Sequence, residues 1–143
     1  MSYTIQHLSK ELIFISWKGT PSTNVAKQFI KELHEIVNIS DKAIYFMSDL
    51  RKGRIIDIRV ISELGRLTQH KNWGGSVAFT NNIISKTFVK TFRKLSFNQQ
   101  ESNAMFDEFE DARAFLEHLK PDVTDGIDWL TVLENGSSAQ SSK

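Results

Sequence analysis

The chain has 143 residues, a net charge of +1 and a 40% hydrophobic share, which together indicate one globular domain with a sizeable core. It contains no cysteine, which excludes disulfides, thiol catalysis and cysteine–zinc sites and is consistent with a cytoplasmic location. The N-terminus has no basic start followed by an apolar run, and no apolar run approaches the roughly 20 residues of a membrane span. We therefore expect neither a signal peptide nor a membrane-spanning helix.

The charges are unevenly distributed along the chain. Residues 51–94 hold ten Lys or Arg and two acids, a balance of +8, whereas residues 101–143 hold ten acids and three bases, a balance of −7. Such asymmetry indicates either a surface with a preferred partner or two segments that neutralise each other in the fold.

The first third of the chain predicts a hairpin followed by a long helix. Residues 3–8 alternate between polar and apolar, as in a half-buried strand, and residues 12–17 are apolar on both faces apart from Ser16, as in a buried strand. The short connection between them implies an antiparallel pair. Apolar residues then recur at helical spacing from Val25 to Val37 and form one stripe.

Strands and helices alternate through the rest of the domain. The pattern predicts strands at 43–50, 74–80 and 104–109 and helices at 57–69, 83–97 and 110–120. Single helices between strands imply parallel crossovers. The order β-β-α-β-α-β-α-β-α therefore predicts an α/β domain over residues 1–120 with a single mixed, mostly parallel sheet.

The C-terminal residues lie outside this alternation. Residues 121–134 form an apolar extension, which we expect to be an extra helix or strand packed on the domain, or a homodimer contact through residues 127–133. Residues 135–143 are small and polar, and this composition predicts a disordered tail.

This element order resembles the anti-sigma-factor-antagonist family, also called STAS or SpoIIAA-like, and in particular its divergent bacterial members of unassigned function. The matching pieces are "ISWKGT" at the end of the hairpin, the strand "AIYFMSDL", the helix around "VISELGRL" and the closing pair "MFDEFEDARAFLEHL". The resemblance covers residues 3 to 120. It implies a non-catalytic regulatory module that works by binding a protein partner.

The family's phosphorylation switch has no counterpart in this sequence. The switch is an Asp-Ser-Ser/Thr-Gly run at the start of the second helix, where a kinase partner phosphorylates the serine. With Asp57 as the motif's Asp, the acceptor position is Ile58; in an ungapped alignment residues 54–57 fill the motif, and neither register has a hydroxyl. Ser48 and Ser62 lie away from the helix N-terminus, where free amides would stabilise a phosphate. We therefore expect regulation without phosphoserine.

A basic face is the first candidate binding surface. Several cations recur at helical spacing in residues 86–94, and others follow the third predicted strand, where ligands bind in open α/β sheets. Together they suit an acidic partner, a phosphorylated ligand or an anionic lipid surface, although cations at this spacing more often belong to a solvated helix face. The candidate residues are Arg51, Lys52, Arg54, Arg59, Lys86, Lys90, Arg93 and Lys94.

An apolar pocket is the second candidate. Trp73, Phe79, Phe88 and Phe92 are large apolar residues of neighbouring elements and can line a pocket for a lipid-like molecule, or can simply fill the core. The alternative function is therefore a carrier or sensor of a small apolar or anionic ligand held between sheet and helices.

Other functions have little support in the residues. The four histidines lack metal-ligand spacing, and no GxSxG elbow or other catalytic constellation is present, so we expect no metal, no cofactor and no enzyme activity. The near-neutral charge and the lack of a binding motif argue against nucleic acid as a partner.

Overall fold

A computed structural model describes residues 3–53, 58–80 and 103–137. Five strands form one sheet in the order β1-β2-β3-β4-β5, in which β1 pairs antiparallel with β2 and the other neighbours are parallel. The predicted α/β class with a mixed, mostly parallel sheet is confirmed. The strands are β1 Tyr3–His7, β2 Leu12–Gly19, β3 Ile44–Gly53, β4 Trp73–Phe79 and β5 Asn103–Phe106.

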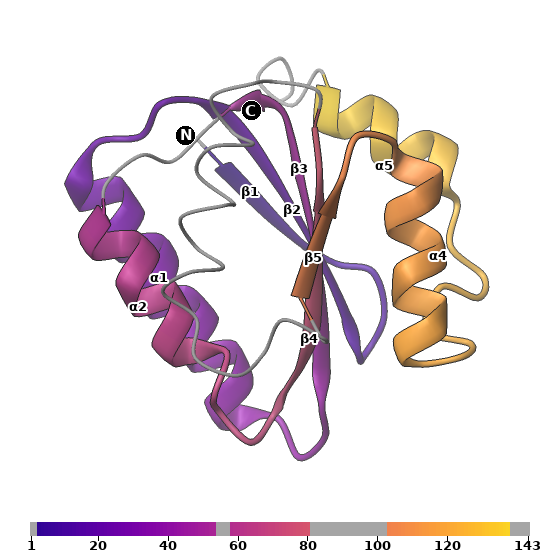
Figure 1. Cartoon of the computed structure of the whole chain (residues 1–143), viewed down its shortest axis with the longest axis horizontal. Helices are drawn as coiled ribbons and strands as arrows, with labels where there is room; N and C mark the ends of the chain where they lie inside the picture. The colour runs from indigo at the N-terminus through magenta and orange to yellow at the C-terminus, as the bar shows by residue number, and fades with distance from the viewer. Residues whose placement is uncertain (1–2, 54–57, 81–102, 138–143) are drawn as a thin grey trace.

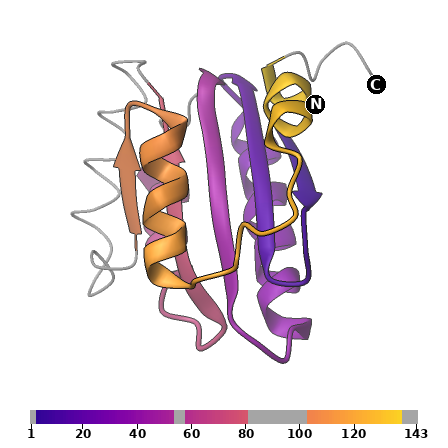
Figure 2. The same cartoon turned by 90° about the vertical axis from the view of Figure 1, so that its right-hand side faces the viewer.

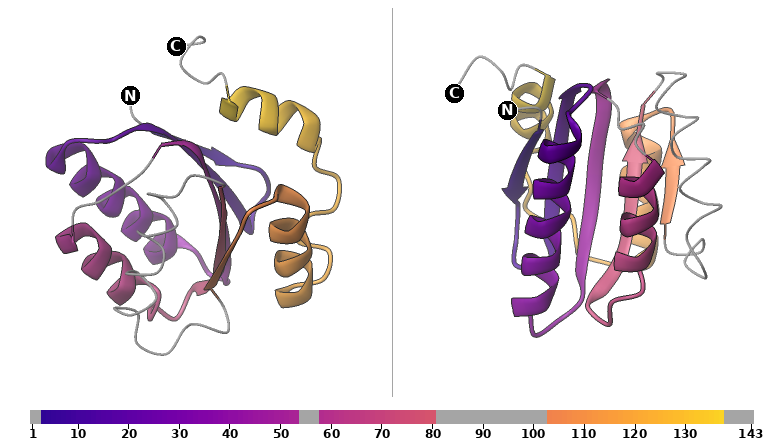
Figure 3. Two further views of the ribbon diagram at one scale, coloured as in Figure 1. Left: turned by 45° about the horizontal axis from the view of Figure 1, so that its top comes forward. Right: turned by 90° about the vertical axis from the view of Figure 1, so that its left-hand side faces the viewer.

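In the described residues, two helices cover one face of the sheet. Helix α1 spans Thr23–Ile39 and α2 spans Ile58–Leu67, and Figures 1 and 3 show them side by side on the same face. Ser22 caps α1 by accepting a hydrogen bond from the Val25 amide at 3.2 Å. The apolar stripe predicted for α1 faces the sheet, where Phe29, Leu33 and Val37 are buried.

Two further helices of the described part of the chain cover the opposite face. Helix α4 spans Phe109–Leu119 and packs on β4 and β5, while α5 spans Trp129–Ser137 and packs on β2 and β3 (Figures 1 and 2). The helix predicted at 83–97 lies outside the described residues. In the described part of the chain, no helix is long and apolar enough to cross a membrane.

The apolar extension belongs to the core of the domain. Val123 and Val132 are buried among the same residues as Leu116 of α4 and Phe14 of β2. The segment contains a helix, α5, that packs on β2 and β3 and continues three residues into the segment predicted as a tail. Leu130 is left 71% exposed. The predicted homodimer contact stays a prediction.

A bulge in β4 divides its aromatic residues between the two faces of the sheet. Ile44 pairs with Trp73 and Tyr45 with Gly75, so Gly74 is an extra residue. A Cβ at Gly74 would lie 2.6 Å from the Tyr45 ring, which explains the glycine. The strand predicted from residue 74 in fact begins one residue earlier, at Trp73.

Candidate functional site

The carboxyl ends of β2, β3, β4 and β5 lie along one edge of the sheet, because these strands are mutually parallel. Binding sites of open α/β sheets form at this edge. The edge therefore contains Arg51 and Lys52, the two residues of the predicted basic face that lie at the end of β3.

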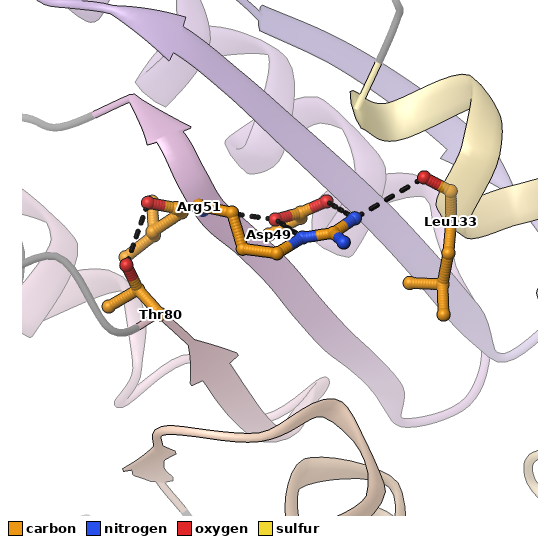
Figure 4. A network of polar contacts seen from close by, with 5 residues as sticks. Asp49, Arg51, Thr80 and Leu133 are labelled. Atoms are coloured by element: carbon orange, nitrogen blue, oxygen red, sulfur yellow. Dashed lines mark hydrogen bonds and ion pairs between the residues drawn. The ribbon is translucent and has the colours of Figure 1, made fainter.

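Asp49 and Arg51 form an ion pair on the face that α4 and α5 cover (Figure 4). The guanidinium of Arg51 donates to both carboxylate oxygens of Asp49, at 2.9 and 2.7 Å, and the Arg51 amide donates to the same carboxylate at 3.0 Å. Asp49 is 2% exposed. The hydrogen bond to Asp49 raises the pKa of Arg51 above its ordinary value, although partial burial opposes the shift.

Two more contacts hold the guanidinium in place. It lies 5.4 Å from the centre of the Phe79 ring and donates to the main-chain carbonyl of Leu133 in α5 at 3.3 Å. Arg51 thus connects the sheet to α5. Although we predicted it as part of the basic face, most of its hydrogen-bonding capacity is used within the domain.

Lys18 and Lys52 are the exposed cations at the ends of β2 and β3. They are direct neighbours across the parallel pair, and both side chains are exposed. Next to them the two strands approach so closely that only a glycine fits at position 53. A Cβ there would lie 2.6 Å from the main-chain nitrogen of Lys18 and from the carbonyl carbon of Trp17. Lys52 was predicted as a site residue and Lys18 was not, since only the register of the two strands brings them together.

The remaining residues of the predicted basic face are not among those described at this edge. Arg59 lies exposed in the first turn of α2. The other predicted cations lie outside the described residues; they are Arg54, Lys86, Lys90, Arg93 and Lys94. For those five, the binding surface stays a prediction.

The predicted apolar pocket is not brought together in the described part of the chain. Trp73 lies on the face covered by α1 and α2, where its ring stacks on Phe46 at a centroid distance of 4.3 Å. Phe79 lies on the opposite face, against Phe109 of α4. Phe88 and Phe92 lie outside the described residues, so the small-ligand hypothesis stays a prediction.

The two hydroxyls nearest to the position of the family's switch motif lie away from the start of α2. Ser48 is in the middle of β3, and Ser62 is in the second turn of α2, which begins at Ile58. Residues 54–57 lie outside the described residues. Within the described ranges, no three His, Asp or Glu side chains gather as metal ligands do.

Two buried polar atoms, one in β2 and one in α5, were not predicted as part of a site. Ser16 is 3% exposed, and its Oγ has no hydrogen-bond partner among the described residues. The same holds for the indole Nε1 of Trp129 in α5. The signal for Ser16 was present in the sequence, because it is the one polar residue in the apolar run of β2.

The sheet order and the helices on both faces define a SpoIIAA-like fold. A solved structure with this fold is that of the anti-sigma factor antagonist SpoIIAA in its unphosphorylated form, with a TM-score of 0.60 and 12% identity. The match covers 81% of this chain and 96% of that one. No protein-family model and no curated protein sequence matches the chain. The resemblance expected from the sequence is confirmed at the level of the fold.

Proposed function

We propose that the chain is a non-catalytic regulatory module that binds a protein partner in the cytoplasm, without a phosphoserine switch. The observation that carries the proposal is the likeness to SpoIIAA, an anti-sigma factor antagonist, across almost the whole of that structure. An antagonist of this kind acts by binding rather than by chemistry. The sequence supports the second half of the proposal, since neither register of the switch motif contains a hydroxyl.

The contact surface that we propose is the edge of the sheet formed by the carboxyl ends of β2, β3, β4 and β5, which we call the carboxyl edge. Lys18 and Lys52 lie side by side and exposed, so their charges repel each other in the free protein. An acidic side chain of a partner placed between them relieves that repulsion. Charges at the rim of an interface act mainly through the rate of association and its dependence on salt.

Charge reversal tests this surface. The tagged chain, carrying either Lys18→Glu with Lys52→Glu or the matched pair Lys27→Glu with Lys31→Glu, is used to recover partners from extracts of its native cells. The matched lysines are exposed on α1, so both variants change the net charge equally. We expect the edge variant to reduce recovery of a stoichiometric partner at least tenfold and the α1 variant to leave it unchanged. Equal recovery with both variants would remove the proposed surface.

Mass spectrometry tests the missing switch. We expect the chain purified from its native cells to carry no phosphate on residues 48–62. Stoichiometric phosphate on Ser48 or Ser62 would contradict this part of the proposal and would leave the binding surface to be judged by charge reversal alone.

A further inference from the structure

The interface between α5 and the sheet contains polar groups that α5 leaves unsatisfied. Ser16 lies beside Asp49 in the register of β2 and β3, and both are almost fully buried. Phe14, two residues before Ser16 and therefore on the same face, contacts the Trp129 ring at a centroid distance of 6.3 Å. Two buried atoms thus have no hydrogen-bond partner among the described residues: Ser16 Oγ on the sheet face that α5 covers, and Trp129 Nε1 on α5 itself.

A buried polar group without a partner is uncommon in folded proteins and costs stability. An alanine or valine at position 16 would suit a permanently covered site better than a serine does. The serine is explained if this part of the sheet meets a different surface in another state of the protein. We call Phe14, Ser16, Asp49 and Arg51 the covered strip.

The attachment of α5 is suited to release. The helix has nine residues, which is too short to be stable without tertiary contacts. It buries Val132 and parts of Trp129 and Leu133 but leaves Leu130 71% exposed. The Trp129 ring also contacts Phe109 of α4 at a centroid distance of 5.0 Å. One polar connection to the covered strip is the 3.3 Å hydrogen bond from Arg51 to the Leu133 carbonyl.

We propose that α5 is a reversible cover and that the covered strip is a docking surface, which a helical segment of a protein partner occupies in place of α5. The face of α5 shows what fits there: an aromatic and an aliphatic anchor, with a main-chain carbonyl for Arg51. The partner segment carries in addition an Asn or Gln side chain that pairs with the Ser16 hydroxyl. The nature of the occupant rests on the proposed function, whereas the opening of α5 is testable without any partner.

Thiol labelling in the full chain measures the opening. The chain has no cysteine, so Ser16→Cys introduces a single, nearly isosteric thiol beneath α5. Ala112→Cys is the matched control, because Ala112 lies on the inner side of α4 and is fully buried on the same side of the sheet. The rate of reaction with a disulfide reagent is compared, for each variant, with its own rate of global unfolding.

We expect the thiol at position 16 to be labelled at least tenfold faster than the protein unfolds globally. Its labelling rate should change little at low urea concentrations, because opening of α5 exposes little surface. The thiol at position 112 reacts only through global unfolding. Val132→Asp weakens the packing of α5 on the sheet. It should therefore raise the labelling rate of the thiol at position 16 further, while the labelling rate at position 112 still equals the rate of global unfolding. Identical behaviour of the two thiols would overturn the proposal of a cover and would leave the proposed function at the carboxyl edge intact.

A peptide titration tests the docking surface. The probe is a synthetic peptide with the sequence of residues 127–137, added to the isotope-labelled full-length Val132→Asp variant. We expect amide signals of Phe14, Ser16 and Asp49 to shift on titration. The wild type responds at least tenfold more weakly, because its own α5 competes at a high effective concentration. No shift in either protein would remove the docking surface, and a wild-type dimer in sedimentation would assign the strip to a second copy instead.

Discussion

Asp49 and Arg51 lie two residues apart on β3, and the guanidinium of one bonds both oxygens of the other's carboxylate. The carboxylate is buried, whereas the side chain of Arg51 is 36% exposed. This difference determines how the two residues respond to substitution.

Arg51→Ala leaves a buried carboxylate without its counter-charge. Because water reaches the position of the guanidinium, we expect a loss of about 2 kcal/mol in unfolding free energy, below the roughly 3–5 typical of a fully buried pair. The double variant Asp49→Leu with Arg51→Met removes both charges and recovers most of that loss. Urea unfolding gives the unfolding free energies of the wild type, Arg51→Ala and the double variant. A double variant less stable than Arg51→Ala would contradict the prediction.

Gly53→Ala tests the close approach of β2 and β3. The new methyl group would lie 2.6 Å from main-chain atoms of Trp17 and Lys18, which cannot move aside independently. We expect a loss of about 2–3 kcal/mol. Gly19→Ala is the control: its φ of 70° is unfavourable for alanine, but no atom lies within 4 Å of the new Cβ, so its loss stays near 1 kcal/mol. Equal losses would mean that the two strands separate easily at this end.

Ser16→Ala removes a hydroxyl that has no partner among the described residues. We therefore expect the unfolding free energy to stay unchanged or to rise by up to about 1 kcal/mol. Thr80→Val is the contrast, since the Thr80 hydroxyl is fully buried and donates to the Leu50 carbonyl at 2.9 Å. That substitution should cost about 1 kcal/mol. Thermal unfolding of both variants checks the pair, and a clear loss with Ser16→Ala would mean that its hydroxyl is hydrogen-bonded.

Thr124→Val tests the connection between α4 and α5. Thr124 donates a short hydrogen bond to Glu117, and this bond, with a smaller contribution from Arg113, lowers the pKa of Glu117 below its ordinary value of 4.5. A carboxylate with a lowered pKa in the folded state stabilises the fold at pH values above 4.5. That contribution is lost as the pH falls through the lowered value.

We expect the Glu117 pKa to return toward its ordinary value in Thr124→Val and to stay low in Thr124→Ser, which keeps the hydroxyl. Carbon-detected NMR titration of the Glu117 carboxyl measures both variants. The acid-induced loss of stability becomes smaller in the valine variant, so an unchanged titration would assign the shift to Arg113 alone.

Much of the architecture was predictable because its signals are local in the sequence. The alternation in β1, the two-faced apolar runs of β2 and β3 and the stripe of α1 each follow from the geometry of a single element. The bulge at Gly74 was not predictable in this way. Simple alternation places Trp73 and Phe79 on the same face, and one extra residue places them on opposite faces.

The candidate site was only partly predictable for a related reason. Lys52 follows the buried strand visibly, but its neighbour Lys18 is more than thirty residues away and joins it only through the register of β2 and β3. Asp49 and Arg51 share a face of one strand, and i,i+2 spacing alone predicts that. That Leu133 completes their contacts depends on where α5 docks, which no local pattern encodes.

The strands lie across the sheet in the same order in which a ribosome makes them. Each new strand of a nascent chain can therefore add beside the one before it, which favours folding during synthesis. Helix α5 is the exception, because the last described element packs back onto β2 and β3, among the first to emerge. Until residue 137 has left the ribosomal exit tunnel, α5 cannot cover Phe14 and Ser16, and both side chains are accessible to chaperones and to a protein partner.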